Sequence, residues 1–373
     1  MKKKKTYLIC IAAILLALLS GKIIWDNYHG TEKEAVKVAV FAYKKSDVFI
    51  SDIIGSMEKM AYTYEEETGI PVQIDVLDAK ENQNDQDRQL DKCLQLDYDV
   101  FCVNLVDRTT ASVVVDKTEA EGIPLIFFNR EPVEQDIKKG KNVYYIGADA
   151  KGSAVLQGKM IADLYVKSPE ELDLDKDGDV EYVMMEGQMG HQDAIIRTEW
   201  SIKTIRSAGV PLKAVESGVA NFDRSQGAAL MEQWLQKGDD IELVICNNDE
   251  MALGAVDAIE KMGIKKDIKI VGIDGIADGI QAVKEGKMYG TVICNSKQQG
   301  ESMFTLAVSL ALNGEPDKSL KLTNERYIRA VSYTHLCHSA SQMVCRKKLF
   351  FCISTHDPPT SGAVCGLYDN RRL

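Results

Sequence analysis

The feature that most constrains the fold is a regular alternation of strand-like and helix-like segments along most of the chain. Runs rich in β-branched and aromatic residues, such as 36–43 and 123–129, predict strands, and apolar residues recur with helical period at 52–68 and 249–262. Strands that alternate with helices form parallel sheets covered by helices on both faces. The alternation restarts after Asn142, so we expect an α/β protein with two doubly wound parallel-sheet lobes.

Charge and cysteine content exclude several classes of protein. Lys and Arg total 45 against 56 Asp and Glu, a net charge of -11, and this acidic balance argues against a nucleic-acid partner. With 45% apolar residues and 27% charged residues, the chain is neither wholly disordered nor a polytopic membrane protein. Nine cysteines form no close pair with metal-ligand spacing, and we expect no disulfide scaffold.

The N-terminus has the plan of an export signal. Residues 1–5 read MKKKK, and an apolar run that is short for a membrane span follows. We expect residues 1–30 to be a signal peptide or an N-terminal anchor, and the protein to be exported to the periplasm or to the outer face of the cytoplasmic membrane. Cys10 lies too early in the run to be a lipoprotein acceptor.

Polar and aromatic side chains follow most of the predicted strands. Ligands of open α/β sheets bind beyond the carboxyl ends of the strands, so these groups are candidate ligand contacts, although a strand-end Asp or Asn can also be a helix cap. Planar amides and carboxylates, an arginine fork and two aromatic faces suit the hydroxyl belt and apolar faces of a pyranose. The candidates are Asp47, Phe49, Asn104, Asn129, His191, Asp193, Arg197, Phe222, Asn248 and Asp274.

The chain carries none of the common catalytic signatures. GxSxG, P-loop and HExxH motifs are absent from the sequence, and no GxGxxG follows the first strand. We therefore expect a protein that is not an enzyme. A glycosidase, the enzymatic alternative, would need two carboxylates at a defined separation in the cleft.

Residues 173–181 read DLDKDGDVE and match the start of a calcium loop. The acidic residues occupy the ligand positions of the EF-hand pattern, and Gly178 occupies the position of the sharp turn. Met184 stands where the bidentate Glu belongs, so a distant carboxylate has to complete the site. The alternative is an acidic surface turn. We expect a structural Ca²⁺ bound by Asp173, Asp175, Asp177, Asp179 and Glu181.

Several long segments resemble the periplasmic glucose/galactose-binding proteins of sugar ABC importers, which have the periplasmic binding protein type 1 fold. They are YKKSDVF (43–49), QNDQDRQLD (83–91), VNLVDR (103–108), IPLIFFNREP (123–132), DLDKDG (173–178), GHQDAIIRT (190–198), IELVICNNDEMALGAVDAI (241–259), VGIDG (271–275) and YGTV (289–292).

The resemblance, which covers about 36–329, implies two lobes joined by three crossings with one hexose enclosed. On it we place lobe I at 36–123 plus 296–330, and lobe II, with the calcium loop, at 124–295. It implies sugar contacts by the strand-end candidates other than Asn129, and Glu242 as the remote calcium ligand. Phe222 stands where the family usually has Trp, so weaker stacking is expected. The family's last sugar-binding Asn aligns without gaps on Cys294, and Asn295 restores the contact only if the chain shifts by one residue.

Residues 331–373 form an anomalous tail, with four cysteines, three histidines and no useful helix or strand period. We interpret this tail as non-native sequence, out of frame or chimeric. The alternative is a lineage-specific extension.

The expected function is an extracytoplasmic, monomeric receptor that captures D-galactose or D-glucose between its lobes and delivers it to an ABC permease in the membrane. The alternative is a sugar sensor that feeds a chemoreceptor or a sensor kinase.

Overall fold

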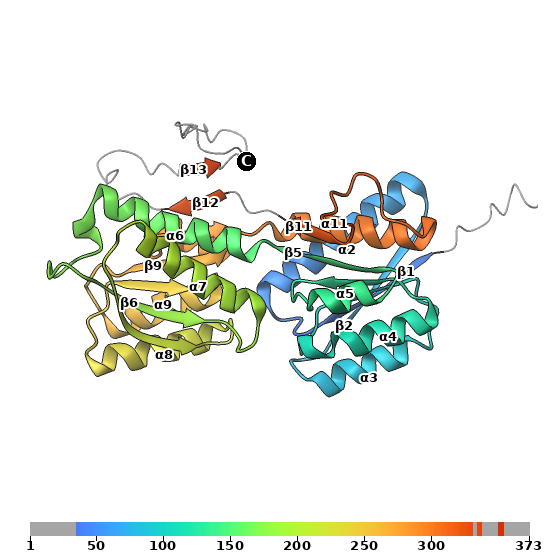
Figure 1. The fold of residues 1–373 in the computed structure, drawn as a ribbon, viewed down its shortest axis with the longest axis horizontal. Coiled ribbons are helices and arrows are strands. Elements are labelled where there is room, and N and C mark those ends of the chain that lie inside the picture. Colours follow the sequence, from blue (N-terminus) through green and yellow to red (C-terminus); the bar gives the residue numbers. More distant parts are fainter. Residues whose placement is uncertain (1–34, 331–333, 338–349, 354–373) are drawn as a thin grey trace, which may run out of the picture.

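The computed structural model describes residues 35–330, 334–337 and 350–353, which form two α/β lobes side by side (Figure 1). The predicted signal or anchor at 1–30 lies outside the described residues. Within the described part, no helix is both long and apolar enough to cross a membrane.

Lobe I contains the N-terminal strands and helices and, near the end of the chain, one further helix and strand. Its elements are β1 (Val36–Ala42), α2 (Val48–Thr68), β2 (Val72–Asp78), α3 (Gln83–Cys93), β3 (Val100–Val103), η1 (Arg108–Thr110), α4 (Ala111–Glu121), β4 (Leu125–Phe128), α5 (Glu134–Lys139), β5 (Val143–Ala148), α11 (Ser296–Asn313) and β11 (Tyr327–Ala330).

Lobe II contains the middle of the chain and two short strands from its last part. Its elements are α6 (Ala150–Lys167), η2 (Pro169–Glu171), β6 (Val180–Glu186), α7 (Gln192–Ser207), β7 (Leu212–Val219), α8 (Arg224–Lys237), β8 (Leu243–Cys246), α9 (Asp249–Met262), β9 (Lys269–Asp274), α10 (Ala277–Glu285), β10 (Gly290–Ile293), β12 (Thr334–Cys337) and β13 (Phe350–Ile353).

The two sheets repeat one strand order. Lobe I runs β2-β1-β3-β4-β5-β11, and lobe II runs β7-β6-β8-β9-β10-β12-β13. The strands are parallel except at β12, which is antiparallel to both of its neighbours. In this order the direction of winding reverses beside the first strand of each lobe, and the crevice formed there is where such sheets bind ligands. The predicted fold class is confirmed.

The central strands of each sheet are buried on both faces, which explains why they are nearly continuous apolar runs, whereas the edge strands β2 and β7 are partly exposed and carry polar residues. In β1, Val38 and Val40 belong to the core cluster that includes residues of α2 and α11, whereas Phe41 belongs to the cluster that includes residues of α3 and α4. Figure 1 shows these two pairs of helices on opposite sides of the lobe I sheet. A strand covered on both sides needs apolar residues at every position.

The predicted boundary between the lobes at residue 124 is wrong. β4 pairs with β3, and β5 pairs with β4 and β11, so residues 124–148 complete the sheet of lobe I. The chain first crosses to lobe II between β5 and α6, where Asp149 caps the new helix. It returns between β10 and α11, and residues 296–330 pack in lobe I as expected.

The tail contains strand structure that the sequence did not predict. Thr334–Cys337 pairs with β10 as β12, and Phe350–Ile353 pairs with β12 as β13. The expectation that the tail has no useful strand period is therefore wrong for these two short segments. The interpretation of the tail as non-native sequence stays a prediction.

Candidate ligand-binding site

A cavity that is partly open to solvent lies between the two lobes, at the carboxyl ends of their strands, with about 380 Å³ of free space including its open mouth. Both lobes contribute polar and aromatic side chains to it. Lobe I provides Tyr43, Asp47, Phe49, Asn129 and Arg130, and lobe II provides His191, Asp193, Arg197, Phe222, Asn248 and Asp274.

Several lining residues also cap helices. A strand-end Asp or Asn can therefore be a helix cap and a candidate ligand contact at the same time. Asp47 accepts a hydrogen bond from the Ile50 amide at the start of α2, and Asn248 accepts one from the Met251 amide at the start of α9. A capping bond fixes a side chain in one orientation. These polar groups are therefore held in place before any ligand arrives.

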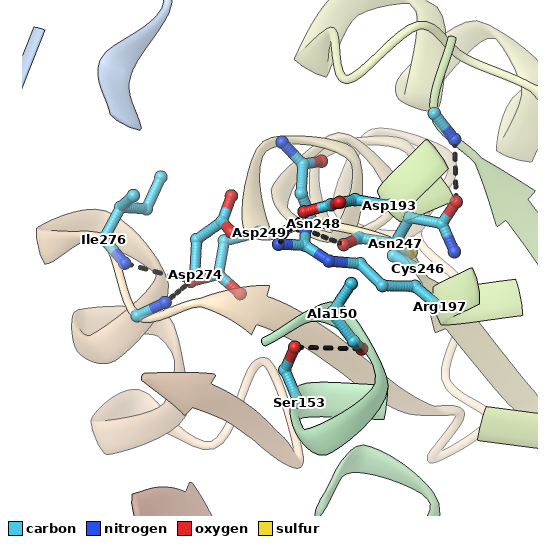
Figure 2. Close-up of polar contacts among 12 residues, drawn as sticks. Ala150, Ser153, Asp193, Arg197, Cys246, Asn247, Asn248, Asp249, Asp274 and Ile276 are labelled. Atoms are coloured by element: carbon cyan, nitrogen blue, oxygen red, sulfur yellow. Dashed lines mark hydrogen bonds and ion pairs between the residues drawn. The ribbon is translucent and has the colours of Figure 1, made fainter. Parts of the chain in front are cut away.

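An arginine and two carboxylates form the polar centre of the lobe II wall (Figure 2). The Arg197 guanidinium donates from Nη1 to the Asn247 carbonyl at 2.8 Å and to Asp274 Oδ1 at 3.3 Å. Its Nη2 lies 3.8 Å from Asp193 Oδ2. The buried Nε has no hydrogen-bond partner among the described residues, so this guanidinium retains donor capacity.

Burial shifts the protonation of these groups. It raises the pKa of Asp193 to about 6, against the opposing effect of Arg197. Burial also raises the pKa of Asp274 well above its usual value, again opposed by Arg197. Burial therefore favours the protonated form of both acids, and the neighbouring Arg197 charge stabilises their carboxylate forms against it.

His191 is neutral in this setting. Burial, followed by the charges of Arg130, Arg197 and Arg108, lowers its pKa well below the usual value. Its Nδ1 accepts from the Asp193 amide at 3.1 Å, which places the ring proton on Nε2. His191 therefore offers the cavity one N–H donor.

Two aromatic rings face the cavity from opposite lobes. Phe49 lies in the first turn of α2, and Phe222 follows β7 with a left-handed backbone at φ 59°. A Cβ at Gly187 would lie 2.0 Å from Phe222 Cζ, so the ring depends on a glycine beside it. The edge of the His191 ring also packs against Phe222, with ring centres 5.1 Å apart.

Asn104 and Asn295 are the predicted contacts that the structure places outside the cavity lining. Asn104 is wholly buried, and its amide donates to the Phe128 carbonyl at 3.0 Å and to Asn129 Oδ1 at 3.3 Å, so it supports Asn129 from behind. Asn295 is exposed and caps α11 through the Gln298 amide. The chain does not shift to bring Asn295 inward, and Cys294 is buried in its place.

Tyr43 and Arg130 line the cavity, and the sequence did not single them out as candidates. The Arg130 guanidinium stacks 3.6 Å above the Tyr43 ring, and the Tyr43 hydroxyl donates to Asp47 at 2.5 Å. Asn129, the strand-end residue outside the predicted contact set, also lines the cavity. The one sequence feature that could have indicated Arg130 as a cavity residue is its position directly after the strand-end residue Asn129.

Polar contacts join the lobes at the mouth of the cavity. Arg130 donates to Gln188 Oε1 at 2.5 Å, and Gln188 donates to Glu81 Oε1 at 3.1 Å. Arg108 donates to Gln192 Oε1 at 2.5 Å. These bonds form only when the lobes are together, so they stabilise the closed arrangement.

Replacing Gln188 with alanine is expected to weaken ligand binding by up to about 30-fold, because two net hydrogen bonds of about 1 kcal/mol each support the closed form. Titration calorimetry measures the effect. Met189→Ala is the matched control, since the neighbouring Met189 side chain is 88% exposed. Equal affinities of the Gln188→Ala and Met189→Ala variants would show that the bond network contributes nothing to closure.

The acidic loop brings its carboxylates together with Glu242. Ligand atoms of Asp173, Asp175 and Glu242 lie within 4.8 Å of one another, and so do those of Asp175, Asp177 and Glu181. Glu242 is fully buried and accepts from the Leu174, Asp175 and Glu181 amides. Asp173 Oδ1 and the buried Glu181 Oε2 have no hydrogen-bond partner among the described residues. Unpaired carboxylate oxygens around a sharp turn at Gly178 fit a hard cation such as Ca²⁺.

Fold and cavity together define a two-lobed substrate-binding protein that encloses a small polar ligand. The family model described as the periplasmic binding protein domain matches residues 38–316, and the chain belongs to this family.

Several proteins that are similar to this chain are described as binding proteins. The chain is 31% identical to a D-galactose/methyl-galactoside binding periplasmic protein of Haemophilus influenzae, over 83% of this chain and 89% of that protein. It is 29% identical to a putative rhizopine-binding protein of Rhizobium meliloti, over 87% and 97%. A solute-binding protein of an ABC transporter from Bacillus halodurans, solved with myo-inositol, has a TM-score of 0.67 at 29% identity, over 81% and 94%. These relatives are binding proteins, which is consistent with a protein that is not an enzyme.

Proposed function

We propose that this protein is an exported receptor that captures a monosaccharide, D-galactose or D-glucose, between its lobes and delivers it to an ABC permease. The observation that supports the proposal is the cavity between the lobes, to which both lobes supply polar side chains that can bind hydroxyls and at least one aromatic ring. The named galactose-binding relative supports the choice of a hexose.

The cavity chemistry matches a neutral sugar. Asp47, Asp193 and Asp274 can accept from hydroxyls, and Arg197 and the neutral His191 can donate to ring and hydroxyl oxygens. The phenyl groups cover apolar C–H faces. A ligand that contacts both lobes favours the closed form over the open one, and the permease can recognise the closed surface.

A panel of sugars tests the proposal by thermal shift. D-galactose and D-glucose are expected to raise the melting temperature of the full chain by several degrees at millimolar concentration. D-ribose, myo-inositol and D-allose serve as comparisons of related chemistry. Stabilisation by one of these three alone would reassign the ligand, and stabilisation by none of the five sugars would refute the receptor proposal.

Phe222→Ala is expected to weaken sugar binding about 10- to 50-fold, because the sugar loses an aromatic face and the cavity gains water. Titration calorimetry with D-galactose measures the loss. Tyr62→Ala provides the control, since that ring is 74% exposed on α2. An unchanged affinity in Phe222→Ala would remove this ring from the ligand site.

We also propose that the acidic loop binds a structural Ca²⁺. Side-chain oxygens of Asp173, Asp175, Asp177, Glu181 and Glu242 would hold the ion, and Asp179 would contribute its backbone carbonyl. The ion would neutralise carboxylates, two of which are buried, and fix the loop that precedes β6.

A further inference from the structure

Asp274 presents its carboxylate from a backbone that is difficult to hold. Its φ is 130°, and Gly275, which follows it, has φ 69°. A residue with a side chain avoids this region, so the conformation persists only if surrounding contacts impose it.

The carboxylate of Asp249 supplies them. Its Oδ2 accepts from the amides of Gly275 at 2.8 Å and Ile276 at 3.1 Å, and its Oδ1 accepts from Thr291 Oγ1 at 2.6 Å. Asp249 is the first residue of α9 and is wholly buried. Figure 2 shows it between Asn248 and the turn that carries Asp274.

Two glycines leave room for this carboxylate. A Cβ at Gly272 would lie 2.1 Å from Asp249 Oδ1, and a Cβ at Gly279 would lie 2.4 Å from Asp249 Oδ2. Neither glycine has a left-handed backbone, so space for the carboxylate explains them better than backbone freedom. The slot is thus shaped around the Asp249 side chain.

We propose that Asp249 is a positioning residue of the ligand site: it does not line the cavity, and it holds the turn after β9 so that Asp274 faces Arg197 and the ligand. This inference deepens the proposed sugar-binding function and rests on it.

The same carboxylate connects the ligand site to a crossing between the lobes. Thr291 lies in β10, which leads directly into the return to lobe I. The Cys294 amide at that crossing donates to the Asp274 carbonyl at 2.9 Å. Asp249 therefore fixes both the turn that presents Asp274 and the strand that enters the crossing.

Three variants separate positioning from general stability. Asp249→Ala removes all three acceptor bonds. Asp249→Asn can keep both amide bonds through its oxygen and can donate to Thr291 Oγ1, so it should restore function. Asp257→Asn is the control in the same helix, because it removes a carboxylate that bonds Arg224 outside the cavity.

The readouts are D-galactose affinity well below the melting temperature and hydrogen exchange of the Gly275 and Ile276 amides without sugar. We expect Asp249→Ala to bind at least about tenfold more weakly and to lose protection at both amides. Asp249→Asn should bind within about threefold of wild type with protection kept, and Asp257→Asn should match wild type.

Wild-type affinity in a folded Asp249→Ala variant, or equal losses in Asp249→Ala and Asp257→Asn, overturns the proposal. If the wild-type chain binds no sugar, the proposed function fails, and the exchange data alone decide on positioning. In that case, Gly275 and Ile276 amides that stay protected from hydrogen exchange in Asp249→Ala would overturn the positioning role of Asp249.

Discussion

Replacing Arg197 with methionine is expected to abolish sugar binding, with an affinity loss of at least about 100-fold. The substitution keeps the bulk of the side chain and removes the charge between Asp193 and Asp274. Removing one partner of a buried ion pair costs about 3–5 kcal/mol, because the remaining charges stay buried without compensation. The sugar also loses the guanidinium that its oxygens would meet.

Titration calorimetry and circular dichroism together measure the effect of Arg197→Met. Arg206→Met is the matched control, since Arg206 lies on the same helix, α7, and is exposed. Arg197→Lys retains the charge and loses the planar guanidinium, so its sugar affinity should lie between those of Arg197→Met and Arg206→Met. A folded Arg197→Met variant that binds D-galactose as tightly as wild type would contradict the assignment of the site.

The second large effect concerns calcium. Removing Ca²⁺ with a chelator is expected to destabilise the protein by about 3–4 kcal/mol relative to saturating Ca²⁺, since an ion that binds only the folded state stabilises it by mass action. Restoring Ca²⁺ should restore the melting temperature. Magnesium should substitute poorly, because it demands a smaller octahedral site.

Two variants of the loop sharpen the calcium test. The Asp175 carboxylate belongs to both groups of clustered ligand atoms, whereas the Asp179 carboxylate belongs to neither. Asp175→Asn should therefore abolish the calcium-dependent shift, and Asp179→Asn should keep most of it, because a backbone carbonyl remains available. A melting temperature independent of Ca²⁺ in the wild-type chain would reduce the loop to an acidic surface turn.

The fold class could be predicted from the sequence because period and order suffice to define doubly wound lobes. The boundary between the lobes could not be predicted from the sequence, because the apolar residues of β4 would suit the sheet of either lobe. Only its pairing with β3 places it in lobe I. The start of α2 also differs from the helical period at 52–68. The helix begins at Val48, because the Asp47 cap brings Phe49 into its first turn.

The site was predictable where a strand end allows one orientation and not where it allows two. Asp47 and Asn248 cap helices, and their caps also place them in the cavity. Asn104 has a similar polar side chain, but its amide donates a hydrogen bond to the Phe128 carbonyl instead of facing the cavity. Arg130 reaches the cavity by stacking on Tyr43, a tertiary contact that has no local sequence pattern.

Isothermal titration of D-galactose into the purified full chain, with Ca²⁺ present, tests the central claim most directly. The account predicts saturable heat with one sugar per chain, and its loss in Arg197→Met. No binding heat from a folded sample, with D-galactose or with D-glucose, would contradict the claim that the two lobes enclose a hexose.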